Sequence, residues 1–263
     1  MREYKTEITL VKNSRGVWSL DPSLGCNSGT KEDKKGCYGD CYAQRSSKKY
    51  GYDFSKTVLR YFKNEKHIES IKKKIKKVDM PFIRMGTNGD PSENWEHTVQ
   101  IIESICNDKQ LSLFKEGKKQ IIIITKHWNK LTENQIKRLS KFNICFNTSV
   151  AALDKEEYLH SCLNEYERLK PYFKSVLRVV SFDFNKKNKK GINLSLLQDY
   201  IFNSYEVLDT VFRCSKNNPL HKEGIINIHS TKFLGKKCYV SKFNKKTYFG
   251  KCSSCLEMCG QRM

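Results

Sequence analysis

Apolar residues recur along the chain with two periods, one typical of strands and one typical of helices. The clearest strand signal is residues 121–124, four consecutive isoleucines, as expected of a parallel strand buried on both faces. Other short apolar segments lie before and after it. Six strands are predicted, at residues 17–21, 81–85, 120–125, 143–149, 175–182 and 207–213.

Helical patterns fill the intervals between these strands. The longest covers about residues 54–78, where Ile68, Ile71, Ile75 and Val78 share one face. The lysines at 72–74, 76 and 77 fall mostly on the other faces, as on a solvated surface. A second helix begins near Ser92. Thr132 and Gln135 predict a capping box that opens a third. Two more helices are predicted, one opened by residues 154–157 and running to about 173, and one at 194–205.

Six strands alternating with five helices predict a parallel α/β domain, either an open barrel or a doubly wound sheet. The lysine-rich residues 186–190 are predicted to form a loop. After about residue 217 the pattern changes to short β-like pieces with glycines, lysines and four cysteines. The expected organisation is therefore a main domain at 1–216 and a Cys-rich, metal- or cluster-binding extension at 217–263.

The charge of the chain is unusual but has two explanations. The 263 residues include 49 Lys+Arg against 28 Asp+Glu, for a formal net charge of +21. This balance fits a nucleic-acid partner. However, only 10 of the 49 basic residues are arginine, and Ile and Asn are abundant, which is also the bias that an AT-rich genome produces.

Several protein classes are excluded or disfavoured by composition. No window holds the 18 or so apolar residues of a membrane span, so no membrane partner is expected. The first seven residues contain no apolar signal region, and we expect a cytoplasmic protein with reduced thiols. The 11 cysteines are then better explained as metal ligands and core residues than as disulfides. Motifs for nucleotide-binding loops, serine hydrolases and zinc proteases are absent.

Three cysteines form the sharpest chemical feature. Ten residues separate Cys26 from Cys37 and three separate Cys37 from Cys41, all in one loop between the first strand and the first long helix. Open α/β sheets and barrels place active sites at such strand ends. Three thiolates without a fourth ligand suit an iron–sulfur cluster with one open iron, whereas a closed zinc site asks for four ligands and the loop has no histidine. The remaining alternative is three unrelated core cysteines.

A second set of cysteines lies near the C-terminus. Cys238, Cys252, Cys255 and Cys259 have the spacing Cys-x13-Cys-x2-Cys-x3-Cys and supply four soft ligands, enough for a closed site that holds either a [4Fe–4S] cluster or zinc. The other cysteines are assigned differently: Cys106, Cys145 and Cys162 are expected in the core, and Cys214 is ambiguous.

The three-cysteine loop resembles that of the radical S-adenosylmethionine superfamily, whose members place it after the first strand of a partial (β/α)6 barrel of parallel strands. The ending Cys37-x3-Cys41-Tyr42-Ala43 is similar to small phage-borne and spore photoproduct lyase-like members. Two features depart from the usual pattern. The spacing is ten and three rather than three and two, and Asp40 stands where an aromatic residue usually precedes the last cysteine.

The resemblance implies a set of cofactor-binding residues. Residues 86–90 resemble the superfamily's Gly-Gly-Glu segment, which holds the amino group of the cofactor's methionine; an ordinary turn that ends in Asp-Pro is the alternative. Ser149 and Arg178 are candidates for the cofactor carboxylate or ribose, against the alternatives of a helix cap and a strand-edge residue paired with an acid. Tyr42 or Tyr38 is the candidate for the adenine contact, and His127 is expected behind the site. The residues assigned to cofactor binding are therefore Gly86, Thr87, Asn88, Gly89, Asp90, Ser149, Arg178 and Tyr42.

The implied activity is that of a radical S-adenosylmethionine (radical SAM) enzyme. Cys26, Cys37 and Cys41 would hold a [4Fe–4S] cluster, a reductase or flavodoxin-type protein would donate an electron, and a 5′-deoxyadenosyl radical would abstract hydrogen from a substrate. The basic balance favours DNA, RNA or a nucleotide as the substrate of a base-modifying step. The alternative is a non-catalytic zinc or iron–sulfur module that binds nucleic acid.

Overall fold

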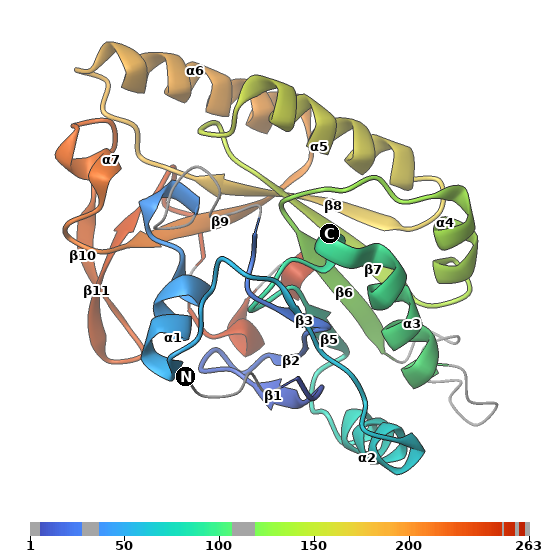
Figure 1. The fold of residues 1–263 in the computed structure, drawn as a ribbon. Helices are drawn as coiled ribbons and strands as arrows, with labels where there is room; N and C mark the ends of the chain where they lie inside the picture. Colours follow the sequence, from blue (N-terminus) through green and yellow to red (C-terminus); the bar gives the residue numbers. More distant parts are fainter. Residues whose placement is uncertain (1–5, 28–36, 107–118, 249, 256–257, 261–263) are drawn as a thin grey trace.

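The computed structural model describes residues 6–27, 37–106, 119–248, 250–255 and 258–260 (Figure 1). Its centre is a nine-stranded sheet with the order β1-β2-β5-β6-β7-β8-β9-β11-β10, and β3 (Ser23–Leu24) pairs with β4 (Val58–Leu59) beside it. The strands of the main sheet are β1 (Leu10–Lys12), β2 (Trp18–Leu20), β5 (Phe82–Met85), β6 (Gln120–Thr125), β7 (Ile144–Val150), β8 (Lys174–Ser181), β9 (Val207–Cys214), β10 (His229–Phe233) and β11 (Lys236–Ser241).

The six predicted strands are confirmed, each end lying within one residue of its expected position. They are β2 and β5 to β9, and each pairs in parallel with its neighbour in chain order. This order places all six carboxyl ends at the same edge of the sheet. The fold is a mixed α/β architecture with a largely parallel central sheet, and within the described residues the sheet does not close into a barrel.

Helices follow the strands in alternation and, as Figure 1 shows, α3 to α6 succeed one another along one side of the sheet. Among the described residues, none of them has both the length and the hydropathy that crossing a membrane requires. The helices are α1 (Tyr42–Tyr50), α2 (Glu65–Lys76), α3 (Trp95–Cys106), α4 (Glu133–Leu139), α5 (Glu156–Leu169), α6 (Lys189–Ser204) and α7 (Pro219–Lys222), with short 3-10 turns η2 (Cys37–Gly39), η3 (Pro91–Asn94), η4 (Cys252–Ser254) and η5 (Met258–Gly260).

The core between the sheet and these helices is aromatic at its centre. Phe146 of β7 is fully buried, and its ring lies 5.0 Å from that of Phe173, 5.6 Å from Trp128 and 5.9 Å from Trp95. Such edge-on and tilted contacts add to the hydrophobic stabilisation of burial. Because side chains alternate along a strand, the neighbouring Asn147 points to the opposite face of the sheet.

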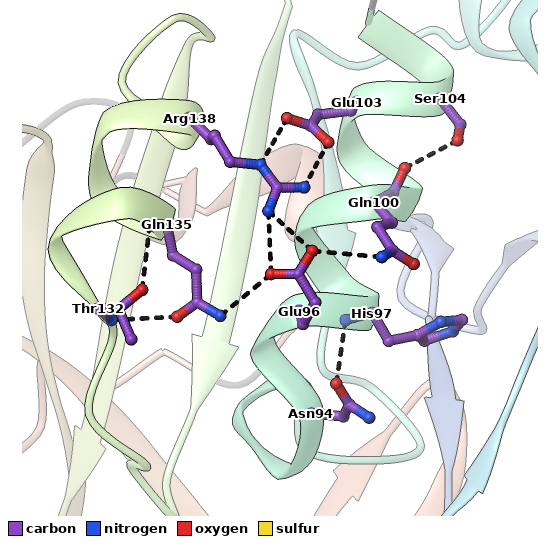
Figure 2. Close-up of polar contacts among 9 residues, drawn as sticks. All are labelled: Asn94, Glu96, His97, Gln100, Glu103, Ser104, Thr132, Gln135 and Arg138. Carbon is purple, nitrogen blue, oxygen red and sulfur yellow. Dashed lines mark hydrogen bonds and ion pairs between the residues drawn. The ribbon is translucent and has the colours of Figure 1, made fainter.

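Helix α4 is fastened to α3 by polar contacts that Figure 2 shows. The capping box is confirmed, since Thr132 accepts from the backbone of Gln135 and the Gln135 side chain accepts from the backbone of Thr132. Arg138 of α4 forms ion pairs with Glu96 at 2.7 Å and Glu103 at 2.6 Å, both on α3. Ion pairs therefore connect α3 and α4 in addition to their apolar packing.

The starts of two helices were predicted wrongly, that of the helix at 54–78 and that of the helix at 194–205. The helix expected from residue 54 begins only at Glu65, because Asn64 caps it by accepting from the backbone of His67 and the chain before it forms β4. The predicted lysine-rich loop at 186–190 is partly helical. Asn188 accepts from the backbone of Lys190 and Gly191, so that α6 starts inside it. Helix α1 was not predicted.

The helix expected from residues 154–157 to about 173 is α5, which ends earlier, at Leu169. Helix α5 begins near the expected place, but Lys155 occupies the N-cap position and makes no side-chain cap. The carboxylate of Asp154 instead accepts from the backbone N–H of Ala151 at 2.7 Å and from the Lys126 ammonium at 2.6 Å. The carboxylate of Asp154 is therefore engaged in a turn and in a long-range ion pair rather than in a cap of α5.

The C-terminal part of the chain continues the main sheet. Strands β10 and β11 form an antiparallel hairpin, and β11 pairs antiparallel with β9 through Tyr239 opposite Cys214. Turns η4 and η5 lie beyond the hairpin, and η5 contacts β7. The Cys-rich extension at 217–263 remains a prediction as a functional unit.

Candidate active site

The three cysteines of the N-terminal loop line one cavity of about 150 Å³ at the carboxyl edge of the parallel strands. The same cavity is lined by parts of the segment that follows β5, by Lys126 and His127 after β6, and by Ser149 of β7. The expectation that strand-end residues converge with the cysteines is met by these elements. The location agrees with the general placement of ligand sites in parallel α/β sheets.

Cys26 and Cys41 are positioned by different local contacts. Cys26 is buried, and its backbone N–H donates to the carbonyl of Phe54 at 2.8 Å. Cys41 is the N-cap residue of α1, and burial raises the pKa of its thiol while the backbone N–H groups of Ala43 and Gln44 oppose the rise. Helix N-termini favour anions, so this thiol is well placed to act as a thiolate ligand.

Cys37 faces a histidine across the cavity. Its Sγ lies 3.6 Å from Nε2 of His127, whose Nδ1 lies 3.4 Å from the hydroxyl of Tyr158. Burial raises the pKa of Cys37 to about 11, which the nearby Lys126 ammonium partly offsets. Among the described residues no three His, Cys, Asp or Glu side chains already stand in a metal-binding arrangement. The thiols share a cavity but would have to converge on a metal.

The turn after β5 is shaped by a carboxylate that the sequence analysis had not singled out. Asp21 is buried and accepts hydrogen bonds from the backbone N–H groups of Gly86, Thr87 and Asn88. Gly86 has φ +89°, and a Cβ there would stand 2.0 Å from the carbonyl oxygen of Ile124, so only glycine fits. The turn is therefore rigidly presented to the cavity.

Within this turn the polar side chains have different surroundings. The Asn88 side chain donates to Asp21 at 3.0 Å, and Asn88 is not part of the cavity lining. The Thr87 hydroxyl is buried and has no partner among the described residues, and Thr87 lines the cavity. The carbonyl of Thr87 accepts a hydrogen bond from the Tyr42 hydroxyl. Thr87 and Tyr42 thus join the turn to α1.

Asp90 braces the edge of the cavity. Its carboxylate accepts five hydrogen bonds, two from Ser92, one from the Thr125 hydroxyl at 2.6 Å, and one each from the backbone N–H of Lys126 and His127. These contacts join the end of β5 to the end of β6 and fix the backbone that carries His127. The predicted cofactor-binding carboxylate is thus occupied by the protein itself.

A buried ion pair stands at the wall of the cavity, which Lys126 lines. Lys126 donates to both oxygens of Asp154, at 2.6 and 2.8 Å, and its ammonium stands 4.9 Å from the ring centre of Tyr38. The Tyr38 hydroxyl donates to the same carboxylate at 2.9 Å. Tyr38 is therefore engaged in this network, whereas Tyr42 lines the cavity. No local sequence signal links these residues, which come from three separate segments.

Ser149 and Arg178 occupy paired positions on β7 and β8 but line different cavities. Ser149 lines the cavity of the three N-terminal cysteines, whereas Arg178 lines a second, smaller one together with Arg84. Burial and the positive charge of Arg84 lower the pKa of Arg178 to about 10. The structure thus divides the predicted cofactor residues between two neighbouring cavities.

The C-terminal cysteines are divided as well. Cys252, Cys255 and Cys259 line the second cavity, whereas Cys238 lies on β11 opposite Thr231 and is not part of that lining. The predicted core positions of Cys106, Cys145 and Cys162 are confirmed by their burial, and Cys214 is also buried.

No known sequence family and no curated protein matches the chain. Solved structures do match. The chain has a fold similar to that of spore photoproduct lyase. A mutant of that enzyme with bound AdoMet and dinucleoside spore photoproduct aligns with a TM-score of 0.52 at 11% identity, over 90% of this chain and 72% of that one. Another spore photoproduct lyase complexed with dinucleoside spore photoproduct aligns with a TM-score of 0.51 at 11% identity, over 89% and 72%. The likeness concerns the fold, and kinship with phage-borne members stays a prediction.

Proposed function

We propose that the protein is a radical SAM enzyme whose [4Fe–4S] cluster is held by Cys26, Cys37 and Cys41. The observation that supports this is their shared cavity at the carboxyl edge of the parallel strands, in a fold similar to that of a lyase with AdoMet bound. Three soft ligands with a fourth position open fit such a cluster. The proposal includes the partial (β/α)6 barrel, with the six parallel strands as its wall.

The surrounding residues would bind and orient the cofactor. When bound, the cluster would supply the electron that cleaves S-adenosylmethionine to methionine and a 5′-deoxyadenosyl radical. The turn held by Asp21 would present its backbone and the Thr87 hydroxyl to the methionine amino group. Ser149 would bond the carboxylate or ribose, and Tyr42 would contact the adenine. Arg178 belongs to the second cavity and is left out of this set.

The proposed substrate is DNA, RNA or a nucleotide, and the proposed electron donor is a reductase or flavodoxin-type protein. The net charge of +21 and the dinucleoside ligand of the structural neighbour support a nucleic-acid substrate. Binding of a short oligonucleotide should then weaken steeply as salt is raised.

A second candidate function follows from His127. Its 3.6 Å contact with Cys37 brings a fourth possible ligand to the three thiols, and Cys3His is a common closed zinc site. In that case the protein would be a non-catalytic module, with the site serving only to hold the loop in place.

One experiment separates the two candidates. The full chain is purified anaerobically, reconstituted with iron and sulfide, and assayed with dithionite for 5′-deoxyadenosine. The radical SAM proposal predicts cofactor cleavage that Cys37→Ala abolishes, Cys238→Ser leaves intact and His127→Ala does not eliminate. Tightly bound zinc, lost in both Cys37→Ala and His127→Ala, together with no cleavage, would establish the zinc module instead.

A further inference from the structure

The C-terminal turn is seated at a defined place on the sheet, on the face opposite Phe146. Asn147 of β7 donates to the carbonyl of Cys259 at 3.3 Å. Gly260 follows with φ +86°, and a Cβ there would stand 2.5 Å from a methyl carbon of Val176 on β8. Only glycine permits this close approach. The thiol of Cys259 therefore stands over the middle of the parallel sheet rather than at a loose chain end.

Three arginines share the second cavity with Cys252, Cys255 and Cys259. They are Arg84 of β5, Arg178 of β8 and Arg15 from the turn before β2. Arg84 is only 8% exposed, and its Nε has no hydrogen-bond partner among the described residues. Within the same residues, none of the three arginines forms an ion pair with a carboxylate; Arg15 donates to the carbonyl of Gly250. The carboxylate of Asp209 also lines this cavity and accepts hydrogen bonds from Asn244 and Thr247. Three guanidinium groups therefore face one carboxylate, and positive charge is in excess among the described lining residues.

Buried cations are stable only when an anion balances them. Protonated thiols carry no charge and cannot do so, whereas thiols that bind a metal lose their protons to solvent and become thiolates. We propose that Cys252, Cys255 and Cys259 bind a second centre of the iron–sulfur class through three thiolates, with Arg15, Arg84 and Arg178 balancing its negative charge.

This ligand set differs from the closed four-cysteine site expected from the spacing. Cys238 lies on the β10–β11 hairpin, outside the cavity lining. Structural zinc asks for four protein ligands, whereas an iron–sulfur cluster tolerates three with one iron open. Since no three donors among the described residues already stand at ligand geometry, the thiols must converge when the cluster forms. The assignment does not depend on the chemistry of the first site.

The test uses the full chain with the first site removed, as the variant Cys26→Ser/Cys37→Ser/Cys41→Ser. After anaerobic reconstitution with iron and sulfide, about four irons and four sulfides per chain should remain. Adding either Cys259→Ser or Cys255→Ser should abolish them, whereas the matched change Cys238→Ser should not. Three results would overturn the proposal: zinc bound in place of iron, no metal bound at all, or loss of the iron and sulfide when Cys238→Ser is added.

The role of the arginines has a separate readout. In the same background, Arg84→Gln should shift the midpoint potential of the cluster to a more negative value, because removing a positive charge favours the oxidised form. Circular dichroism establishes that the variant is folded. A folded, cluster-loaded variant with an unchanged potential would contradict the charge-balancing role. Failure of the radical SAM proposal would appear instead as missing 5′-deoxyadenosine in the wild-type chain.

Discussion

Asp21 binds Asn88 twice: its Oδ2 accepts from both the backbone N–H and the side-chain Nδ2 of Asn88, each at 3.0 Å. Its other oxygen accepts from the backbone of Gly86 and Thr87 at 3.0 and 2.8 Å. One buried carboxylate at the end of β2 therefore organises the turn after β5. This turn is the one that we propose holds the cofactor.

Replacing this carboxylate should damage both stability and cofactor binding. In Asp21→Asn, an amide with two N–H donors faces backbone donors, and part of the turn loses its acceptor. The free energy of unfolding should fall by about 2 kcal/mol, as for buried hydrogen bonds to a charged group. Urea denaturation and calorimetric titration with S-adenosylmethionine measure the two effects. Asp53→Asn, a change at an exposed aspartate whose carboxylate accepts from Ser55 two residues away and lies near Lys56, is the control. Equal effects of both changes would contradict the special role of Asp21.

Gly86→Ala should be more harmful than Gly51→Ala. Both glycines have positive φ, +89° and +75°, so both substitutions carry the backbone cost of about 1–2 kcal/mol. A Cβ at Gly51 meets nothing within 4 Å, whereas at Gly86 it meets the carbonyl of Ile124 at 2.0 Å. Urea denaturation should therefore show a clearly larger loss for Gly86→Ala, with cofactor binding lost in that variant alone. Similar losses of stability in Gly86→Ala and Gly51→Ala would mean that the turn can shift to accommodate a Cβ at little cost.

The pair of Lys126 and Asp154 should tolerate loss of both charges better than loss of one. The two side chains are 15% and 5% exposed and 2.6 Å apart, so Lys126→Met leaves a buried carboxylate without its cation. A loss of about 3 kcal/mol is expected for that variant. The double variant Lys126→Met/Asp154→Asn should recover part of it. Chemical denaturation of the wild type, both single variants and the double variant measures the coupling, and strict additivity would show that the pair is not coupled.

The contact between α3 and α4 should make stability depend on pH in the acid range. Hydrogen bonds from Arg138 hold the pKa of Glu103 and of Glu96 below their ordinary values (Figure 2). In the unfolded chain these carboxyls take up protons near pH 4.5, before the folded chain does. The stabilisation is thus present above that pH and is lost as pH falls through the lower folded pKa values.

Arg138→Gln measures this contribution. The variant should be less stable than the wild type by about 1 kcal/mol at neutral pH, and the difference should shrink toward acid pH. Lys137→Gln, a change at the exposed neighbouring residue, should alter neither the stability at neutral pH nor its dependence on pH. A difference between Arg138→Gln and wild type that stays constant from neutral to acid pH would show that packing, rather than charge, is what Arg138 contributes.

Local patterns were sufficient for the elements of the sheet. The isoleucine run at 121–124 predicted β6 with the bounds that the structure has, and the capping box of α4 was predicted from two residues three positions apart. Both signals are carried by neighbouring residues, so no knowledge of the fold was needed. The same local approach misplaced the start of α2, because helical periodicity continued through residues that Asn64 excludes from the helix.

The candidate site was predicted in part. The cysteines of the N-terminal loop and the turn at 86–90 were found because each is a compact motif at a strand end. Asp21, Lys126 and Asp154 were missed, since their roles depend on partners 28 to 116 residues away. The contact of His127 with Cys37, separated by 90 residues, was likewise beyond any local pattern.

The sequence by itself determined the parallel α/β class, the order of its strands along the chain, and the two groups of cysteines. Only the tertiary structure decided that Cys238 stands apart from Cys252, Cys255 and Cys259, and that Arg178 faces these cysteines rather than the cavity of Ser149. The physical reason is that spacing along the chain restricts which residues can meet. Strand pairing and the face of the sheet to which each side chain points then select which of them do.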